Sequence, residues 1–284
     1  MSLENAVAQS KTQATADPCG TDISVSVVSH GQIDLVSELL LGLKEHCAGL
    51  HIELLLTLNF DEPLPFALDS FPFPIKLRVN PVPLGFGANQ NRAFTHASGR
   101  YFCVINPDIR FNSNPFTTML ACLDDSWAGV VAPAVLGEDG TLEDSARRFP
   151  TPVVILQKLL GKGLKQEYLF GDKPIYPDWV AGMFMLFPRD VFARLAGFDE
   201  RYFLYYEDVD ICARLRLLGY TTVLCPQARV VHLAQRHSHR SLKYLRWHLV
   251  SMARFFLSFA FWRIRHGSLA QPLVILAADN ETRQ

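Results

Sequence analysis

Short apolar runs alternate along the chain with segments in which apolar residues recur every three or four positions. The runs have the length and composition of buried strands, whereas the second spacing is typical of amphipathic helices. Strands are predicted at residues 23–28, 52–58, 75–79 and 101–105, and helices at 33–43 and 88–97. This alternation predicts an α/β domain with a mostly parallel sheet.

The pattern continues less regularly in the second half. It predicts strands at residues 130–135, 180–187 and 222–226, and a helix at 208–218 that ends at Gly219. From about residue 241 to 262 the spacing is again helical, and the polar positions there are basic. The second half is too small to form a domain alone, so we expect it to extend the same sheet.

The composition indicates a globular chain. Of 284 residues, 49% are hydrophobic and 19% charged, which excludes disorder, collagen and coiled coil for the bulk. The formal net charge is −1, so no overall field attracts nucleic acid, and no nucleic-acid partner is predicted.

Cysteine usage and hydropathy favour a cytoplasmic protein. The six cysteines are widely spaced and form no Cys-x-x-Cys pair, which predicts buried, reduced thiols. The first 22 residues do not resemble a secretion signal. The longest uncharged apolar run near the C-terminus, residues 255–262, is shorter than the roughly 20 residues that span a bilayer. We therefore expect at most a peripheral membrane contact.

A candidate metal ligand follows the strand at 101–105. Asn106 and Asp108 lie in an Asn-Pro-Asp turn at the carboxyl end of that strand, where α/β sheets bind ligands. One carboxylate is enough for Mg²⁺ or Mn²⁺ when substrate phosphates and waters complete the shell. The same tripeptide is also an ordinary turn sequence.

A glycine-rich segment, GFGANQNR at 85–92, precedes that strand. Its glycines would let a ligand approach the backbone, and its polar side chains would donate hydrogen bonds. It is not a dinucleotide fingerprint, because position 90 is Gln rather than Gly. The alternative is a glycine-rich turn before an amide-capped helix.

The segment GFDERYFLYYEDVD at 197–210 places five acids among aromatic residues, directly before a predicted helix. Acids at a helix start complement the helix dipole, which explains them without any function. The aromatic approach, however, could line a cleft for a sugar, and a carboxylate held there is a reasonable general base.

Residues 211–278 contain no Asp or Glu but ten Lys or Arg. Together with its aromatic residues, this stretch predicts a helix that rests on anionic lipid or receives a pyrophosphate-linked acceptor. The alternative is an amphipathic helix packed on its own domain. His232 ends a strand-like stretch and could reach a site at the edge of the sheet.

Taken together, these motifs resemble the inverting glycosyltransferase family 2, in particular its bacterial rhamnosyltransferase-like branch. The resemblance covers about residues 23–256 and also includes VAGMFMLFPRD at 180–190. It implies a GT-A fold, which is a Rossmann-like, mostly parallel sheet flanked by helices, with a C-terminal helical extension. The implied divisions are a flexible tail (1–21), a GT-A domain (22–235) with nucleotide-sugar-binding (22–125) and acceptor (126–235) halves, and a basic aromatic helical extension (236–284).

The resemblance also implies roles for individual residues. Asp108 corresponds to the last acid of the DxD motif and would bind Mg²⁺ or Mn²⁺, assisted by His232. Asp208 corresponds to the general base, with Glu207 beside it. Donor-binding positions are Ser29, His30, Asn59, Gly85, Gly87, Asn89, Asn91, Arg92 and Asn106; acceptor-binding positions are Trp179, Gly182, Tyr205 and Tyr206.

The implied reaction is an inverting transfer from a dTDP- or UDP-sugar, best L-rhamnose from dTDP-L-rhamnose, to a hydroxyl of a cell-surface glycan or lipid-linked precursor at the inner face of the membrane. The family's base-contacting acid is replaced here by Leu58-Asn59, which leaves Asn59 and Asp61 as candidates. The alternatives are a sugar nucleotidyltransferase, although Ser29-His-Gly lacks its phosphate loop, and a non-catalytic nucleotide- or glycan-binding module.

Overall fold

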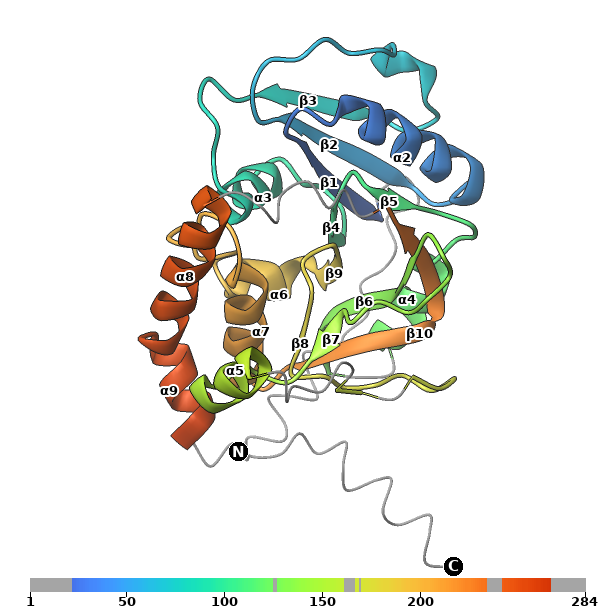
Figure 1. Cartoon of the computed structure of the whole chain (residues 1–284). Helices are drawn as coiled ribbons and strands as arrows, with labels where there is room; N and C mark the ends of the chain where they lie inside the picture. The colour runs from blue at the N-terminus through green and yellow to red at the C-terminus, as the bar shows by residue number, and fades with distance from the viewer. Residues whose placement is uncertain (1–21, 125–126, 161–166, 169, 234–241, 267–284) are drawn as a thin grey trace, which may run out of the picture.

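The computed structural model describes residues 22–124, 127–160, 167–168, 170–233 and 242–266 (Figure 1). The tail predicted for residues 1–21 lies outside the described residues, as do residues 236–241 and 267–284 of the predicted extension. The described part is built around an eight-stranded sheet of order β3-β2-β1-β4-β9-β6-β10-β5. Helices cover both faces of this sheet.

The first half of the chain forms the parallel part of the sheet. Its strands and helices are β1 (Ile23–Ser29), α2 (Ile33–His46), β2 (Ile52–Leu58), β3 (Ile75–Val79), α3 (Phe86–Phe94) and β4 (Tyr101–Ile105). A short 3₁₀ helix, η2 (Leu68–Ser70), precedes β3. β1 pairs in parallel with both β2 and β4, and β2 pairs in parallel with β3. The predicted strands are confirmed, and α3 begins two residues earlier than expected.

The second half adds strands of both directions. They are β5 (Ile109–Arg110), β6 (Ala128–Gly137), β9 (Phe184–Pro188) and β10 (Thr221–His232). β9 lies between β4 and β6 and is antiparallel to both, so the sheet is mixed. The strand predicted at 180–187 is interrupted: its first part is β8 (Trp179–Val180), which pairs with β7 (Ala146–Arg147) in a separate ribbon.

The remaining helices are α4 (Phe116–Asp124), α5 (Pro152–Leu159), α6 (Arg189–Arg194), α7 (Glu207–Leu217), α8 (Leu242–Phe256) and α9 (Phe259–His266). The single helix expected at about 241–262 is thus two helices. Ser258 separates them, and its hydroxyl accepts a hydrogen bond from the Phe261 N–H, as a cap does. Within the described residues, no helix combines the length and the apolar character needed to cross a membrane.

Alternate residues of the strands pack into two hydrophobic cores, one on each face of the sheet. On one face, Val25, Leu54 and Leu186 pack with residues of α2 and α4. On the other face, Phe102 and Phe187 pack with residues of α3, α6 and α7. Because each such side chain contributes about 1.5–3 kcal/mol when fully buried, these two layers fix the strand ends that carry the polar residues.

A third cluster joins α7 to α8 and α9 through Phe255 and Phe261. In Figure 1 the two C-terminal helices stand beside α7 at one side of the sheet. The inner face of the C-terminal helices therefore packs on the chain's own domain.

The cysteines differ from the expectation in one respect. Cys47, Cys103 and Cys212 are buried thiols, as predicted, but Cys122 and Cys225 are paired as a disulfide, so the prediction of thiols throughout is wrong. The pair lies 103 residues apart in sequence, and only the packing of α4 on β10 brings it together. Cys19 lies outside the described residues.

Candidate active site

The two predicted metal ligands lie together. Asp108 follows β4, His232 ends β10, and the antiparallel pairing of β5 with β10 places them side by side. The distance between Asp108 Oδ2 and His232 Nε2 is 3.2 Å, and each side chain is only 15% exposed. These residues are 124 positions apart in sequence.

A residue that the sequence analysis did not identify, Glu143, lies on the other side of this histidine. Its Oε2 is 2.9 Å from His232 Nδ1. Burial alone would lower the pKa of His232, but its contacts with Asp108 and Glu143 outweigh this effect and raise the pKa to about 9. The ring is therefore held between two carboxylates. No local signal marks Glu143, because it lies in the turn after β6 and meets His232 only in the fold.

The donor set fits a hard divalent cation. Asp108 Oδ1 is buried and accepts no hydrogen bond within the described residues, so one carboxylate oxygen is available. Adjacent ligands of an octahedral ion with bonds near 2.1 Å are about 3 Å apart, close to the Asp108–His232 separation. No group of three or more potential ligands occurs in the described residues. An ion here would thus need substrate phosphates and waters, as Mg²⁺ commonly does.

Asp208 lies on the first turn of α7 and is fixed by the backbone. The Gly182 N–H donates to its Oδ2 at 3.1 Å, and the Val209 N–H donates to its Oδ1 at 2.8 Å. Two consecutive residues before the helix, Tyr205 and Tyr206, have φ values of 70° and 68°. This left-handed conformation is costly for bulky residues, and residues that adopt it cluster at functional sites.

Burial dominates the electrostatics of the acidic pair. It raises the pKa of Asp208 although the N–H groups of Gly182 and Val209 oppose the shift. Glu207 is only 6% exposed, and burial together with the Asp208 charge raises its pKa well above the ordinary value. Its Oε2 has no hydrogen-bond partner in the described part of the chain. Burial therefore favours the protonated form of Glu207, whereas the backbone N–H groups around Asp208 favour its charged form.

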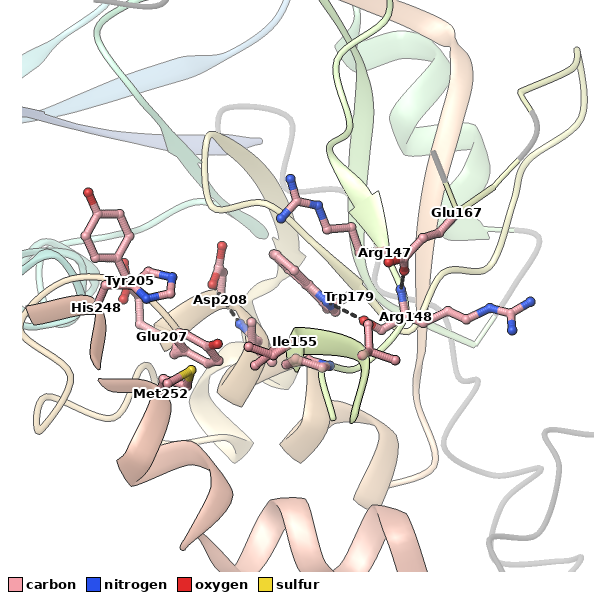
Figure 2. Close-up of a pocket in the computed structure, with 14 residues that line it drawn as sticks. Arg147, Arg148, Ile155, Glu167, Trp179, Tyr205, Glu207, Asp208, His248 and Met252 are labelled. Atoms are coloured by element: carbon pink, nitrogen blue, oxygen red, sulfur yellow. Dashed lines mark hydrogen bonds between the residues drawn. The ribbon is translucent and has the colours of Figure 1, made fainter. Parts of the chain in front are cut away.

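A cavity of about 430 Å³ opens beside Asp208 (Figure 2). Trp179, Tyr205 and Tyr206, three of the four predicted acceptor-binding residues, line it, and the fourth, Gly182, hydrogen-bonds Asp208. Helix α8 contributes His248 and Met252 to the cavity, and the His248 ring contacts both tyrosine rings at 5.4 and 5.5 Å between centroids. Helix α8 is therefore part of the cavity wall.

One short segment connects the cavity to the metal-ligand pair. The Asn106 N–H donates to the Met183 carbonyl at 2.9 Å, while the adjacent Gly182 holds Asp208. Residues 182 and 183 thus join the turn that carries Asp108 to the carboxylate of Asp208.

Among the predicted donor-binding residues, Asn59 and Asn89 form a buried amide network with Asn80. Asn59 Oδ1 accepts hydrogen bonds from both other amides and from the Leu84 N–H, at 2.8–3.1 Å. The Asn59 amide nitrogen lies 3.0 Å from both the Leu84 carbonyl and His30 Nδ1. The amides of Asn59 and Asn89 therefore hold the loop before α3.

Gly85, Gly87 and Asn91 join α3 to the acidic aromatic segment. A Cβ on Gly85 would lie 2.6 Å from the Phe203 carbonyl, and one on Gly87 would lie 2.8 Å from Phe198 Cβ. Asn91 exchanges two hydrogen bonds of 2.8 Å with the backbone of Phe198. Packing within the chain thus requires the small size of these glycines, in agreement with the glycine-rich turn that was the alternative to a ligand contact.

The other predicted donor-binding residues lie at or near this edge. Ser29 is buried at the end of β1, where its hydroxyl accepts from the Gln32 N–H, and Arg92 is exposed on α3. The structure thus places the donor candidates along the ends of β1, β2 and β4 and on α3, while the acceptor candidates surround Asp208.

Two further residues of the cavity wall, Arg147 and Arg148, were not identified from the sequence. They come from β7 and the residue after it, on the side opposite the acidic pair (Figure 2). The guanidinium carbon of Arg147 lies 5.5 Å from the Trp179 ring centroid.

Comparison with known proteins identifies the family. The family model "Glycosyl transferase family 2" matches residues 24–192. Rhamnosyltransferase WbbL of Escherichia coli (strain K12) is 30% identical over 248 residues, which cover 82% of this chain and 92% of that protein. An N-acetylglucosaminyl-diphospho-decaprenol L-rhamnosyltransferase of Mycobacterium tuberculosis is 29% identical over 190 residues, which cover 58% of this chain and 61% of that protein.

Solved structures support the fold. GalNAc-T7 with UDP, GalNAc and Mn²⁺ has a TM-score of 0.63 at 17% identity, over 94% of this chain and 55% of that one. Mannosyltransferase PcManGT of Pyrobaculum calidifontis with GDP-Man and Mn²⁺ has a TM-score of 0.57 at 16% identity, over 98% and 86%. The predicted GT-A fold is therefore confirmed. The chain belongs to glycosyltransferase family 2 and is a transferase similar to bacterial rhamnosyltransferases.

Proposed function

We propose that this protein transfers a sugar, with inversion, from a nucleoside diphosphate donor to an acceptor hydroxyl, and that Asp208 is the general base. The observation that carries the proposal is the position of Asp208, whose carboxylate is fixed at the cavity by Gly182 while the adjacent Met183 holds the turn that bears Asp108. Residues 182 and 183 thus position both the base and the proposed diphosphate site. In a single displacement, the base would act on the acceptor hydroxyl while the other site binds the leaving diphosphate.

On the acceptor side, the chain's own residues can account for proton removal. Burial raises the pKa of Asp208 and so strengthens it as a base, while two backbone N–H groups fix its orientation. Asp208 takes the proton of the acceptor hydroxyl, and the oxygen attacks the anomeric carbon from the face opposite the diphosphate. The bond from that carbon to the diphosphate breaks, the diphosphate leaves with the electron pair, and the configuration inverts.

On the donor side, Asp108 and His232 would hold Mg²⁺ or Mn²⁺. Such an ion, when bound, supplies Lewis-acid stabilisation of the negative charge that grows on the departing diphosphate. Glu143 would fix the tautomer and orientation of His232, as carboxylates behind metal-bound histidines do.

For the donor itself we propose dTDP-L-rhamnose, which rests on the similarity to rhamnosyltransferases. Because the Asn59 amide is occupied within the chain, we assign the contact with the nucleotide base to the exposed Asp61. Asn59, Asn89 and the two glycines of α3 would then shape the donor site through the loop that they hold.

For the acceptor we propose a cell-surface glycan or its lipid-linked precursor at the cytoplasmic face of the membrane. The name of the mycobacterial relative describes a sugar linked through a diphosphate to a lipid. The outer side of α8, α9 and the turn between them carries exposed apolar side chains, such as Leu257 (81%) and Phe259 (75%), together with basic residues. Apolar and basic residues on the same helices are suited to an anionic bilayer surface.

Incubation with dTDP-L-rhamnose or UDP-sugars and Mn²⁺ tests the proposed function. We expect release of the nucleoside diphosphate, faster with dTDP-L-rhamnose and accelerated by an acceptor. If no nucleoside diphosphate is released under any condition, the protein is a binding module. If a nucleoside triphosphate forms from the sugar donor and added inorganic pyrophosphate, the protein is a nucleotidyltransferase.

A further inference from the structure

The cavity beside Asp208 has walls of opposite charge. Glu207 and Asp208 lie on one side with the side chains of α8, and Trp179 lies between them and the other side (Figure 2). That other side carries Arg147 and Arg148 and one acid, Glu167, whose carboxylate accepts the Arg148 N–H. An uncharged sugar does not require a guanidinium group, yet two arginines line this cavity. These two arginines are suited to an anionic group on a ligand that enters the cavity.

Arg147 is held in place without engaging its terminal nitrogens. Its Nε lies 2.9 Å from Asp144 Oδ2 in an ion pair that lacks hydrogen-bond geometry, and its guanidinium stands over the Trp179 ring. No other carboxylate in the described residues forms an ion pair with it. A guanidinium fixed in this way is pre-organised to bind an oxyanion through two parallel N–H donors.

The positive charge of Arg147 acts on the catalytic side of the cavity. It lowers the pKa of both Asp208 and Tyr206, although burial leaves both pKa values raised overall. Arg147 is thus near enough to influence the proposed base and yet makes no contact with it. A ligand whose hydroxyl meets Asp208 can therefore place a second group at Arg147.

Arg148 extends the basic wall outward. Its backbone is fixed on both sides, because its N–H donates to Glu167 Oε2 at 2.7 Å and its carbonyl accepts from Trp179 Nε1 at 2.9 Å. Its side chain is exposed and forms no hydrogen bond or ion pair with the described residues. Figure 2 shows it extending away from Asp208, toward the outer side of the cavity.

We propose that Arg147, supported by Arg148, binds a phosphate attached to the acceptor sugar. This inference rests on the proposed function, since it assigns the cavity to the acceptor. The phosphate would lie across the cavity from the reacting hydroxyl, and the charge of Arg147 would offset repulsion between the phosphate and Asp208. The site thus selects an acceptor sugar that bears a phosphate or diphosphate over the same sugar without one.

The test compares N-acetylglucosamine 1-phosphate with N-acetylglucosamine by ligand-observed NMR titration. The enzyme is first saturated with dTDP and Mg²⁺, so that the donor's own diphosphate site is filled. We expect the wild type to bind the phosphorylated sugar at least about tenfold more tightly. Arg147→Gln and Arg148→Gln should reduce this preference, whereas Arg229→Gln, an exposed arginine outside the cavity, should preserve it.

Equal binding of the two sugars by the wild type would overturn the proposal. A preference for the phosphorylated sugar that disappears when dTDP is present, or that both arginine variants retain, would also overturn it. If Arg147→Gln misfolds, two other variants still test the proposal. Arg147→Lys keeps the charge without the planar fork, and the exposed Arg148 can be changed without loss of packing. A wild type that cleaves the donor but shows no phosphate preference would contradict only this inference. A preference without any nucleoside diphosphate release would contradict the proposed function instead.

Discussion

Asp208 is the residue on which the chemistry depends, and its amide variant separates chemistry from binding. Asp208→Asn preserves the size of the side chain and an oxygen that can accept from Gly182 or Val209 but removes the basic carboxylate. We expect dTDP affinity to remain within about twofold and transfer to fall by about 10²–10⁴-fold, the usual contribution of a general base. Isothermal titration and a transfer assay measure the two quantities.

The control for this variant is Asp190→Asn, which changes an exposed acid on α6. Full transfer activity in Asp208→Asn would remove the assignment of the base, and equal losses in both variants would point to a general structural effect.

Glu143 is proposed to act only through His232. Glu143→Gln should weaken Mn²⁺ binding in the presence of dTDP by about 10–100-fold, which is the usual cost of losing the carboxylate behind a metal-bound histidine. Electron paramagnetic resonance of free Mn²⁺ measures this directly, without turnover. Glu138→Gln, an exposed acid in the same turn, is the matched control. Unchanged Mn²⁺ affinity in Glu143→Gln would contradict the role of this residue.

Glu53 is a buried acid far from the cavity and links stability to pH. Burial alone would raise its pKa, but hydrogen bonds from Lys76, Ser24 and Ser98 outweigh that effect and hold the pKa at about 2. A depressed pKa contributes stability above the ordinary value of 4.5, and this contribution is lost as pH falls toward 2. We expect a loss of about 3 kcal/mol over this range.

Urea unfolding of the wild type and Glu53→Gln at several pH values checks this prediction. The variant should be less stable at pH 7 and should vary less between pH 5 and 2. Parallel curves for the two proteins would show that Glu53 does not provide the linkage.

At the scale of elements, sequence pattern predicts the parallel part of the sheet well. The strands at β2, β3 and β4 have the predicted bounds. β2 and β4 are mainly apolar runs, whereas β3 alternates apolar and basic residues, and both patterns are typical of strands. Pairing direction is not encoded in such runs, so the antiparallel β9 could not be predicted. The extension of β10 to His232 depends on its partners β6 and β5, which also lie far away in sequence.

The helices of the basic C-terminal stretch have two different faces. Its inner face packs on the acidic aromatic segment, where Ser251 Oγ donates to the Leu204 carbonyl and the Phe203 and Trp247 rings lie 4.6 Å apart. The outer face is exposed and both apolar and basic. Self-packing and lipid contact are therefore not exclusive alternatives, because a helix can place one face on its own domain and offer the other to a partner.

The outer face can be tested without disturbing the cavity. Leu257→Ser with Phe259→Ser should reduce co-sedimentation with vesicles containing phosphatidylglycerol several-fold, because both side chains are mostly exposed and available to insert. Leu41→Ser, an exposed leucine on α2, should bind vesicles like the wild type. Unaltered sedimentation of the double variant, with unchanged melting temperature, would leave this face without a role at the membrane.

At the scale of the whole molecule, the candidate site could be predicted in part. Asp108, Asp208 and His232 were recognisable because each lies in a distinctive local motif or at the end of a predicted strand. Glu143, Arg147 and Arg148 come from a turn and a short ribbon whose sequence has no such signal. They enter the site only because β6, β8 and β10 bring that segment beside His232 and Trp179.

The same scale explains why several predicted donor residues have internal partners. Asn59, Asn89 and Asn91 are polar residues at strand and helix ends, where both ligand contacts and loop support occur. Their hydrogen bonds show that they support loops on which the site is built.

The central claim is that the cation site at Asp108 and the base at Asp208 serve one cleft. Paramagnetic relaxation by Mn²⁺ tests it most directly: with dTDP present, the protons of N-acetylglucosamine bound beside Asp208 are monitored as Mn²⁺ is added at the Asp108–His232 pair. We predict strongly enhanced relaxation in the wild type and none in Asp108→Ala under the same conditions. Enhancement that is absent from the wild type, or equal in Asp108→Ala, would contradict the account.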